Sequence, residues 1–215
     1  MYQTCTTKGA IKNMYVVLDT ETTGLYPSKH EMIAYCGIKL NAQLEEIGRL
    51  HIKIKPQNIT QADPEALRVN GYSDYRWRDA IEPTDAGNLI ADFMRDCIPV
   101  AHNWPFDRGF ILAHLNKHTN GRKILRRGID TVSLASAVLI PMGYKSVSMH
   151  TIADLFGWPK QTHEALDDTL YCVQLLRLLY PYNARNMIKV RMMLYRAKIA
   201  LYMNPMRGKN NGAKS

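Results

Sequence analysis

The sequence predicts an α/β fold in which a mixed β-sheet is flanked by helices. Two observations support this class. Three short apolar runs lie close together near the amino terminus, and helical patterns alternate with further short apolar runs after them. With 215 residues, 46% of them apolar and 22% charged, the chain has the length and composition of one globular domain.

The first three elements are expected to be strands. MYVVLDT at 14–20 is a β-branched apolar run typical of a buried strand, and partly alternating runs follow at 32–40 and 48–56. Gly24, Pro27 and the turn-forming segment NAQLEE separate these runs. Because the connections are short, we expect the three strands to form an antiparallel meander.

The rest of the chain alternates between helices and short strands. A short helix is predicted to begin near Pro64 and to end before Gly71, and a longer one to begin with a cap at Thr84 or Asp85. The remaining elements are expected, in order, as a strand at 98–102, a helix at 106–118, a strand at 128–132 and helices at 133–140, 151–157 and 164–180.

Basic residues are concentrated in two segments. Residues 183–215 contain no acid and account for +8 of the net charge of +9, through Arg185, Lys189, Arg191, Arg196, Lys198, Arg207, Lys209 and Lys214. The stretch from Arg108 to Ile129 is also free of acids. This distribution favours a polyanionic partner, because neutralising phosphates releases counterions, although a basic tail also promotes solubility. We expect a main domain over 1–182 and a basic helical extension over 183–215 with a disordered end.

Neither a membrane segment nor an export signal is recognisable. No apolar run approaches the roughly 18 residues that span a membrane, and the run near the start is too short for a signal peptide. Four cysteines, Cys5, Cys36, Cys97 and Cys172, lack the close C-x-x-C spacing of zinc or redox sites. The sequence therefore predicts a cytoplasmic protein with reduced, mostly buried thiols and no membrane partner.

Asp19 and Glu21, in LDTETTGL, stand at the end of the first predicted strand. Residues two apart on a strand project to the same face, so the two carboxylates lie side by side while Thr20 points away. Two such carboxylates repel each other and lose hydration, and a cation that neutralises both is the better explanation for the pair. Their oxygens suit Mg²⁺ or Mn²⁺. An isolated D-x-E pair is more often a solvated turn, so further acids are needed.

Two later segments place acids at helix starts. HNWPFD ends in Asp107, and HEALDD begins with His163 and ends in Asp167 and Asp168. Each acid could simply cap its helix. On a continuous helix His163 and Asp168 would lie roughly 140° apart, so both reach one site only if His163 is on the loop that enters the helix. Asp168 is favoured over Asp167 as the residue that faces this site.

LDTETTGL, HNWPFD and HEALDD, in this order, resemble the three motifs of the DEDD exonucleases. The resemblance is to the histidine-containing, DnaQ-like branch, which includes the epsilon proofreading subunit of DNA polymerase III, ribonuclease T and oligoribonuclease. It spans about residues 14–180 and includes IDTVSLA at 129–135. The resemblance implies a ribonuclease-H-like fold and hydrolysis of phosphodiester bonds from the 3′ end. All five catalytic positions hold the expected residue, which argues against a non-catalytic nucleic-acid-binding module.

By position, the resemblance implies that Asp19, Glu21, Asp107 and Asp168 are metal ligands and that His163 is the general base. Two Mg²⁺ or Mn²⁺ ions about 3.5–4 Å apart would bridge the scissile phosphate, one activating the water and the other stabilising the leaving 3′ oxygen. His163 would take the proton from the attacking water. The residues that the resemblance implies for the terminal nucleotide are Thr22, Thr23, Gly24, Leu25, His102, Asn103 and Phe106.

Three positions depart from the usual motifs. Trp104 and Pro105 replace smaller residues, and Thr169 follows the last Asp where alanine is more usual. Trp104 either offers a stacking surface to a base or packs under its helix. The implied partner is the 3′ end of single-stranded nucleic acid, with DNA favoured and RNA the alternative, because discrimination between them needs contacts to the 2′-hydroxyl. A polymerase or another replication protein is a second candidate partner.

Overall fold

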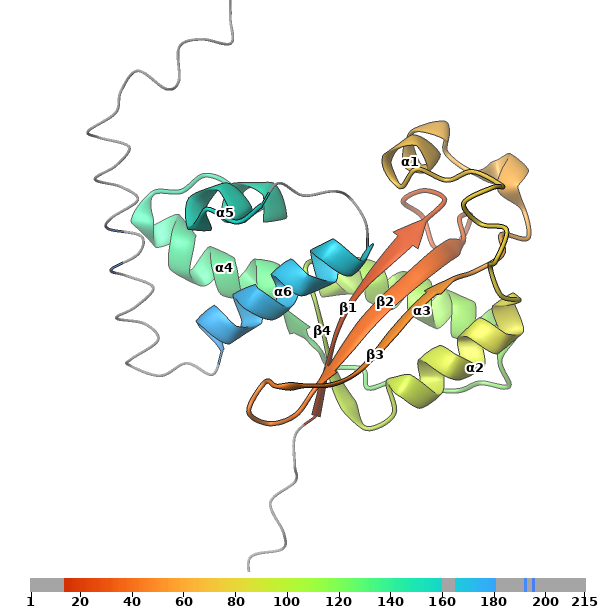
Figure 1. Cartoon of the computed structure of the whole chain (residues 1–215), viewed down its shortest axis with the longest axis horizontal. Helices are drawn as coiled ribbons and strands as arrows, with labels where there is room; N and C mark the ends of the chain where they lie inside the picture. Colours follow the sequence, from red (N-terminus) through yellow and green to blue (C-terminus); the bar gives the residue numbers. More distant parts are fainter. Residues whose placement is uncertain (1–13, 160–164, 181–191, 193–194, 196–215) are drawn as a thin grey trace, which may run out of the picture.

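The computed structural model of the chain describes residues 14–159, 165–180, 192 and 195. It confirms the α/β class: a five-stranded mixed sheet of order β3-β2-β1-β4-β5 has helices on both faces (Figure 1). The strands are β1 (Met14–Thr22), β2 (Met32–Leu40), β3 (Glu46–Lys53), β4 (Cys97–Ala101) and β5 (Ile129–Asp130).

The antiparallel meander predicted for the first three strands is confirmed, since β1 pairs with β2 and β2 with β3 in antiparallel register. The later strands add on the other side of β1, where β4 pairs with β1 and β5 with β4, both in parallel. Strand β1 therefore lies at the centre of the sheet, where β4 pairs with its first residues, Met14–Val17, and β2 pairs with its carboxyl-terminal end.

The predicted helices are present, and most of them begin one or two residues away from the predicted start. Those that the structure describes are η1 (Ile59–Gln61), α1 (Pro64–Val69), α2 (Pro83–Phe93), α3 (Trp104–His118), α4 (Thr131–Leu139), η2 (Ile140–Met142), α5 (Met149–Phe156) and α6 (Ala165–Leu179). The predicted cap of α2 at Thr84 or Asp85 is wrong: the helix begins at Pro83, after Glu82, and no side chain caps it. Proline has a preset φ and no N–H to satisfy, so it can start a helix unaided.

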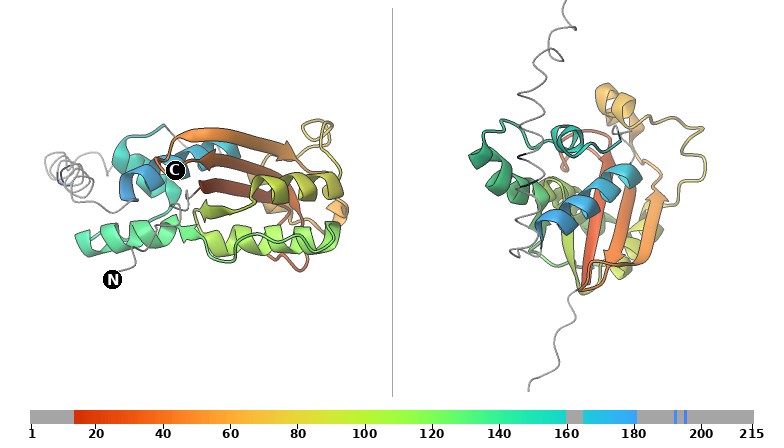
Figure 2. Two further views of the ribbon diagram at one scale, coloured as in Figure 1. Left: turned by 90° about the horizontal axis from the view of Figure 1, so that it is seen from below. Right: turned by 60° about the vertical axis from the view of Figure 1, so that its left-hand side comes forward.

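Strand β1 is covered on both faces, and its residues alternate between two cores. Val16 and Leu18 belong to the cluster that includes buried residues of α2 and α3. Tyr15 and Val17 belong to the cluster that includes residues of α6. Figure 2 shows these helices on opposite sides of the sheet. Because strand residues alternate between faces, side chains near the end of β1 must point alternately toward α3 and toward α6.

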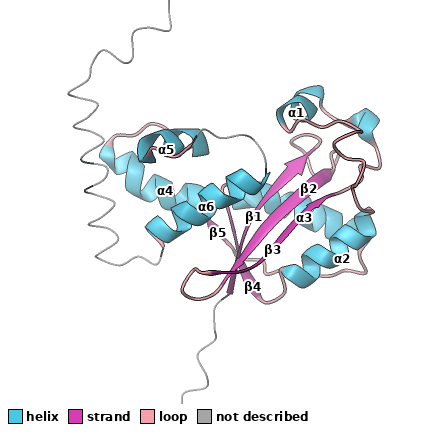
Figure 3. Cartoon of the chain, in the orientation of Figure 1, coloured by secondary structure: helices cyan, strands magenta, loops and turns pink. Residues whose placement is uncertain are grey.

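The segment between β3 and α2 is mostly loop around α1, and it lies beyond the end toward which β1 points (Figure 3). Its buried Asn70 donates from Nδ2 to the carbonyl oxygen of Thr22 at 3.0 Å. Trp77, also buried, donates from Nε1 to the carbonyl oxygen of Ile33 at 2.8 Å. These bonds fix the loop against the ends of β1 and β2.

Cys36, Cys97 and Cys172 are free and buried, as predicted, and Cys5 lies outside the described residues. Burial raises the pKa of Cys36 to about 11 and that of Cys172 to about 12. In the described part of the chain, no helix is long and apolar enough to cross a membrane. Residues 183–215 lie outside that part except for Met192 and Tyr195, so the division at 182 stays a prediction.

Candidate active site

Asp19 and Glu21 lie near the carboxyl-terminal end of β1, at the centre of the sheet. Asp19 continues the row of Val17, which faces α6, and it lines a cavity with residues of that helix. Thr20 continues the row of Leu18, which faces α3, and it contacts that helix. The predicted alternation along LDTE is therefore confirmed, and Thr20 turns out to have a contact of its own.

Asp107 reaches the site from the first turn of α3, on the opposite face of the sheet from α6. Its side chain is only 2% exposed, and its Oδ1 accepts a hydrogen bond from Thr20 Oγ1 at 2.8 Å. Burial raises the pKa of Asp107 to about 7, although the bond from Thr20 acts to lower it. A carboxyl in such a place is partly protonated near neutral pH unless a positive charge comes close.

Asp168 reaches the site from the first turn of α6, one helical turn before the buried Cys172. The pKa of Asp19 is raised well above its ordinary value by burial and then by the charges of Asp107, Glu21 and Asp168. The four predicted ligands, carried by β1, α3 and α6, are thus electrostatic neighbours. Residues of β1, α5 and α6, together with His102 just after β4, line a cavity of about 180 Å³: Leu18, Asp19, His102, Met149, Asp168 and Cys172.

The four carboxylates are close without sharing one coordination point. Among the residues that the structure describes, no three His, Cys, Asp or Glu side chains are arranged so that they could hold a metal ion together. The site nevertheless has the chemistry that a divalent cation requires, since it combines carboxylate oxygens with burial that is unfavourable to their charge. His163, the predicted base, lies outside the described residues, in the stretch 160–164 just before α6.

The turn before α3 is held by Asp130, which the sequence shows only as part of IDTVSLA. One of its oxygens accepts from the backbone N–H groups of Asn103, at 3.0 Å, and Trp104, at 3.3 Å, while the carboxylate also caps α4 through Val132 and Ser133. Although burial acts to raise it, hydrogen bonds led by that from Ser133 keep the pKa of Asp130 below its ordinary value. A stable charge on Asp130 thus fixes the start of the helix that carries Asp107.

Trp104 is 5% exposed and packs in the core beneath α3. The alternative in which this ring stacks on a base is therefore wrong, and packing under the helix is correct. His102 lines the cavity with Asp19, and its Nδ1 lies 3.0 Å from Thr131 Oγ1. Phe106 packs against Phe110, with ring centroids 5.0 Å apart. The proposed role of His102, Asn103 and Phe106 at the terminal nucleotide stays a prediction.

The turn at the end of β1, Thr22–Leu25, is fixed by hydrogen bonds within itself and to Glu31. Thr22 Oγ1 donates to the carbonyl oxygen of Gly24 at 2.7 Å, and Thr23 exchanges two 2.8 Å bonds with the backbone of Glu31. A Cβ at Gly24 would lie 2.6 Å from the ring of His30, so the close approach requires glycine. Leu25, by contrast, is 66% exposed. The turn therefore presents one apolar side chain from a fixed backbone.

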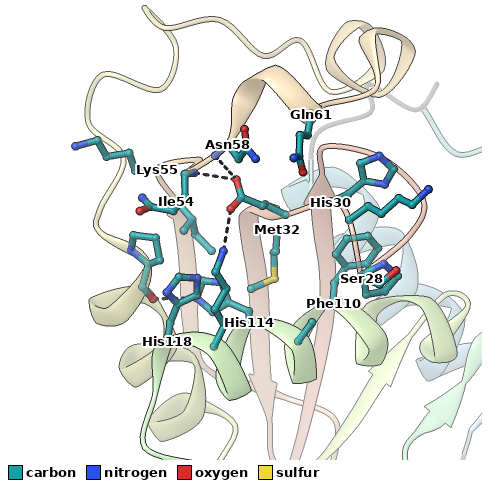
Figure 4. Close-up of a pocket in the computed structure, with 17 residues that line it drawn as sticks. Ser28, His30, Met32, Ile54, Lys55, Asn58, Gln61, Phe110, His114 and His118 are labelled. Atoms are coloured by element: carbon teal, nitrogen blue, oxygen red, sulfur yellow. Dashed lines mark hydrogen bonds and ion pairs between the residues drawn. The ribbon is translucent and has the colours of Figure 1, made fainter.

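A larger pocket, of about 320 Å³, lies beside α3 rather than at the carboxylates (Figure 4). Glu31 lines this pocket, and both of its carboxylate oxygens have partners: Oε2 accepts from the N–H groups of Gln57, at 2.8 Å, and Asn58, at 2.9 Å, and Oε1 pairs with Lys117 at 3.4 Å. His114 is buried there, with Nε2 2.9 Å from the carbonyl oxygen of Pro83. Glu31 therefore links the segment 54–61 to α3, and it also supports the turn after β1.

Three curated relatives show where similar sequences occur. DNA polymerase III PolC-type of Thermotoga maritima is 29% identical over 161 residues, which cover 74% of this chain and 11% of that protein. DNA polymerase III subunit epsilon of Haemophilus influenzae is 34% identical over 105 residues, or 46% and 40% of the two chains. Ribonuclease T of Haemophilus influenzae is 29% identical over 171 residues, or 72% and 73%. The chain thus spans less than half of the two polymerase proteins.

Solved structures of exonuclease I share the fold. The enzyme from Methylocaldum szegediense superposes with a TM-score of 0.68 at 18% identity, covering 89% of this chain and 45% of that one. The zinc-bound complex of Escherichia coli exonuclease I with single-stranded DNA has a TM-score of 0.68 at 15% identity, covering 84% and 43%. The ribonuclease-H-like fold implied by the three motifs is therefore confirmed.

The profile of the RNase T family, described as "Exonuclease", matches residues 16–176. This range contains all three acidic motifs, from LDTETTGL to HEALDD, and most of the described fold. The chain belongs to this exonuclease family.

Proposed function

We propose that the chain is a divalent-metal-dependent 3′→5′ exonuclease that shortens single-stranded DNA. The observation that carries the proposal is the convergence of Asp19, Glu21, Asp107 and Asp168 at one end of the sheet, where burial and mutual repulsion raise the pKa of Asp19. A site with buried carboxylates that repel one another favours a cation, and the family provides the reaction for which such a site is suited.

Each acid has a proposed role in holding the cation. Asp19 and Asp168 would bind it from the α6 face, Asp107 from the start of α3, and Glu21 from the adjoining position on β1. The carboxylates would have to come closer together than they lie here. When bound, a divalent cation would lower the pKa of a water or stabilise the leaving 3′ oxygen. A pair of cations would divide these two tasks between them. Mg²⁺ and Mn²⁺ fit an all-oxygen donor set.

The remaining residues act on the substrate and the proton. Thr20 would orient Asp107 through its 2.8 Å hydrogen bond. Thr22, Thr23 and Gly24 would hold the terminal sugar with backbone groups, and the exposed Leu25 would pack against its base. His163 would take the proton from the attacking water, a role suited to a group that titrates near neutral pH.

RNA is the second candidate substrate, and one observation favours it. The match to ribonuclease T covers 72% of this chain and 73% of that protein, so the two are similar in extent. DNA is favoured by the DNA polymerase III relatives and by the bound strand in the exonuclease I complex. The same polymerase relatives support a polymerase or replication protein as a candidate partner.

Digestion of matched oligonucleotides tests the proposal. Single-stranded DNA and RNA of one sequence, labelled at the 5′ end, would be incubated with Mg²⁺, Mn²⁺ or EDTA. We expect a ladder of labelled products that shortens from the 3′ end, faster for DNA, and no cleavage in EDTA. Early release of the labelled 5′ nucleotide, or equal cleavage in EDTA and by Asp19→Ala, would contradict the proposal. Faster digestion of RNA would make RNA the favoured substrate and DNA the second candidate.

A further inference from the structure

The sheet carries two parallel rows that join the acids of β1 to basic residues of β3. Asp19 is paired with Cys36, and Cys36 with His51. Glu21 is paired with Ala34, and Ala34 with Lys53. Residues directly opposite each other in a sheet point to the same face, so each row has an acid, a small residue and a base on the α6 face. Two cross-strand steps separate acid from base by roughly 10 Å.

A small pocket lies along the second row and adjoins the carboxylate site. Its volume is about 80 Å³, and its lining consists of Glu21, Ala34, His51, Lys53, Asn70, Arg76, Trp77 and Ala165. This is well below the roughly 300–1,000 Å³ of pockets for drug-sized ligands, so the space suits a phosphate group rather than a base. Among the described residues of this lining, Glu21 is the one acid.

The cations of this pocket are held in place before any ligand arrives. Lys53 Nζ donates to the carbonyl oxygen of Arg76 at 2.8 Å and lies 4.8 Å from the ring centroid of Trp77. The guanidinium of Arg76 lies 6.0 Å from the same ring, and its Nη1 donates to the carbonyl oxygen of Gly71 at 2.9 Å. Trp77 is itself buried and bonded to Ile33. Preorganised side chains lose less conformational entropy when they bind.

We propose that Lys53 and Arg76 form a subsite for a backbone phosphate, one nucleotide to the 5′ side of the scissile bond. The inference rests on the proposed exonuclease function, because Glu21 sets the position of the scissile phosphate. With that phosphate at the carboxylates, the strand continues across Ala34 and brings its next phosphate to the two cations. The subsite recognises charge and not sequence, as backbone contacts do.

Binding of trinucleotides to the full chain in EDTA tests this subsite without requiring turnover. The probes are an unphosphorylated DNA trinucleotide and the same molecule with a neutral methylphosphonate at its 5′-side linkage, each competing against a fluorescent oligonucleotide. For Lys53→Gln we expect about tenfold weaker binding of the natural trinucleotide, the loss typical of one charge-assisted phosphate contact. The methylphosphonate trinucleotide should bind the wild type and Lys53→Gln with affinities within twofold of each other, because its 5′-side linkage carries no charge for Lys53 to contact.

Lys39→Gln is the matched control. Lys39 Nζ also lies 4.8 Å above an aromatic ring, that of Phe93, but on β2 and outside the pocket beside Glu21. This variant should bind both trinucleotides as the wild type does. It also corrects for any general effect of removing one positive charge, which acts at long range and is screened by salt.

Kinetics give a second readout that a loss of folding would not mimic. In Mg²⁺, Lys53→Gln should raise KM for the trinucleotide about tenfold, leave kcat within twofold and leave an unphosphorylated dinucleotide unaffected, since that substrate has only the scissile phosphate. Equal weakening of natural and methylphosphonate trinucleotides, or no weakening of either, overturns the subsite. A wild type that cleaves nothing would refute the proposed function, while the binding comparison would still decide the subsite.

Discussion

Two pockets in the described part of the chain differ in charge balance more than in size. The larger one, beside α3, has a volume of about 320 Å³, and its Glu31 carboxylate is neutralised by Lys117 and two backbone N–H groups. The smaller cavity, about 180 Å³ at the end of β1, contains Asp19 and Asp168, and the pKa of Asp19 is raised by burial and by three neighbouring acids. The volume of a pocket therefore says less about its chemistry than the charges around its acids.

This contrast predicts opposite effects for neutral substitutions in the two places. An acid that is already neutralised contributes to folding, and its loss should lower stability. An acid whose pKa is raised by burial opposes folding in its charged form until a cation binds, so its loss should affect activity and leave stability intact or higher.

The largest effect is expected for Asp107→Asn. The substitution keeps the shape of the side chain but removes a proposed ligand, so exonuclease activity in Mg²⁺ should fall at least about 100-fold, since even residues that only orient ligands contribute 10–100-fold. Urea unfolding in EDTA at pH 8 should show a free energy of unfolding equal to or above that of the wild type. Asp85→Asn, an exposed acid in the first turn of α2, is the control and should change neither quantity. An active Asp107→Asn would remove this residue from the site.

The next effect is the dependence of metal-free stability on pH. The pKa of Asp107 is about 7 in the folded protein against an ordinary value of 3.8. Between these two pH values the folded state therefore binds one more proton than the unfolded state. The contribution of this group to the free energy of unfolding is fully present below about pH 4. It decreases as the pH rises to about 7, by up to about 1.4 kcal/mol per pH unit. Urea titrations in EDTA between pH 4 and 8 would measure it.

The comparison of wild type with Asp107→Asn isolates this contribution from acids whose pKa is shifted the other way, such as Asp130. The difference between the two proteins should favour the wild type at pH 4 and shift toward the variant by pH 8. A difference that is constant with pH, or that moves in the opposite direction, would show that Asp107 is charged in the folded protein throughout.

The smallest effect is expected for Glu31→Gln in the larger pocket. Gln loses the charge that pairs with Lys117 and weakens the bonds to Gln57 and Asn58, so the free energy of unfolding should fall by about 1–2 kcal/mol. Exonuclease activity at a temperature well below unfolding should stay within about threefold of the wild type, because the backbone bonds between Glu31 and Thr23 do not need the carboxylate. A loss of activity as large as that of Asp107→Asn would mean that charge balance does not separate the two pockets.

Local patterns predicted most of the elements and the antiparallel meander of the first three strands, but not where the later strands join the sheet. Strand β2 has the predicted bounds, Met32–Leu40, and the helix predicted at 164–180 is α6, because apolar spacing and turn residues act within a few residues of each other. The position of β4 beside β1 depends on contacts between distant segments. The start of α3 at Trp104 depends on a distant partner too, since Asp130 binds the backbone there.

The candidate site could be predicted as a set of acids but not in its supporting contacts. Alternation along β1 predicted that Thr20 points to the other face of the sheet from Asp19 and Glu21. Only the fold shows that α3 covers that face and that Asp107 accepts the hydrogen bond of Thr20 there. Asp130 had a sequence signal as a helix cap, followed by Val132 and Ser133. Its second contact, with the HNWPFD turn, has no counterpart in local sequence. The burial of Trp104 likewise depends on the packing of α3 against the sheet.

Calorimetric titration of Mn²⁺ into the protein at pH 7, in two buffers with different enthalpies of ionisation, tests the central claim most directly. If the acids at the end of β1 form a cation site, Mn²⁺ should bind the wild type and release protons, because carboxyls with a raised pKa must lose them to become ligands. Asp107→Asn should bind at least about tenfold more weakly and release fewer protons. Binding that is equally tight in the variant, or that releases no protons from the wild type, would contradict the assignment of these carboxylates as the metal site.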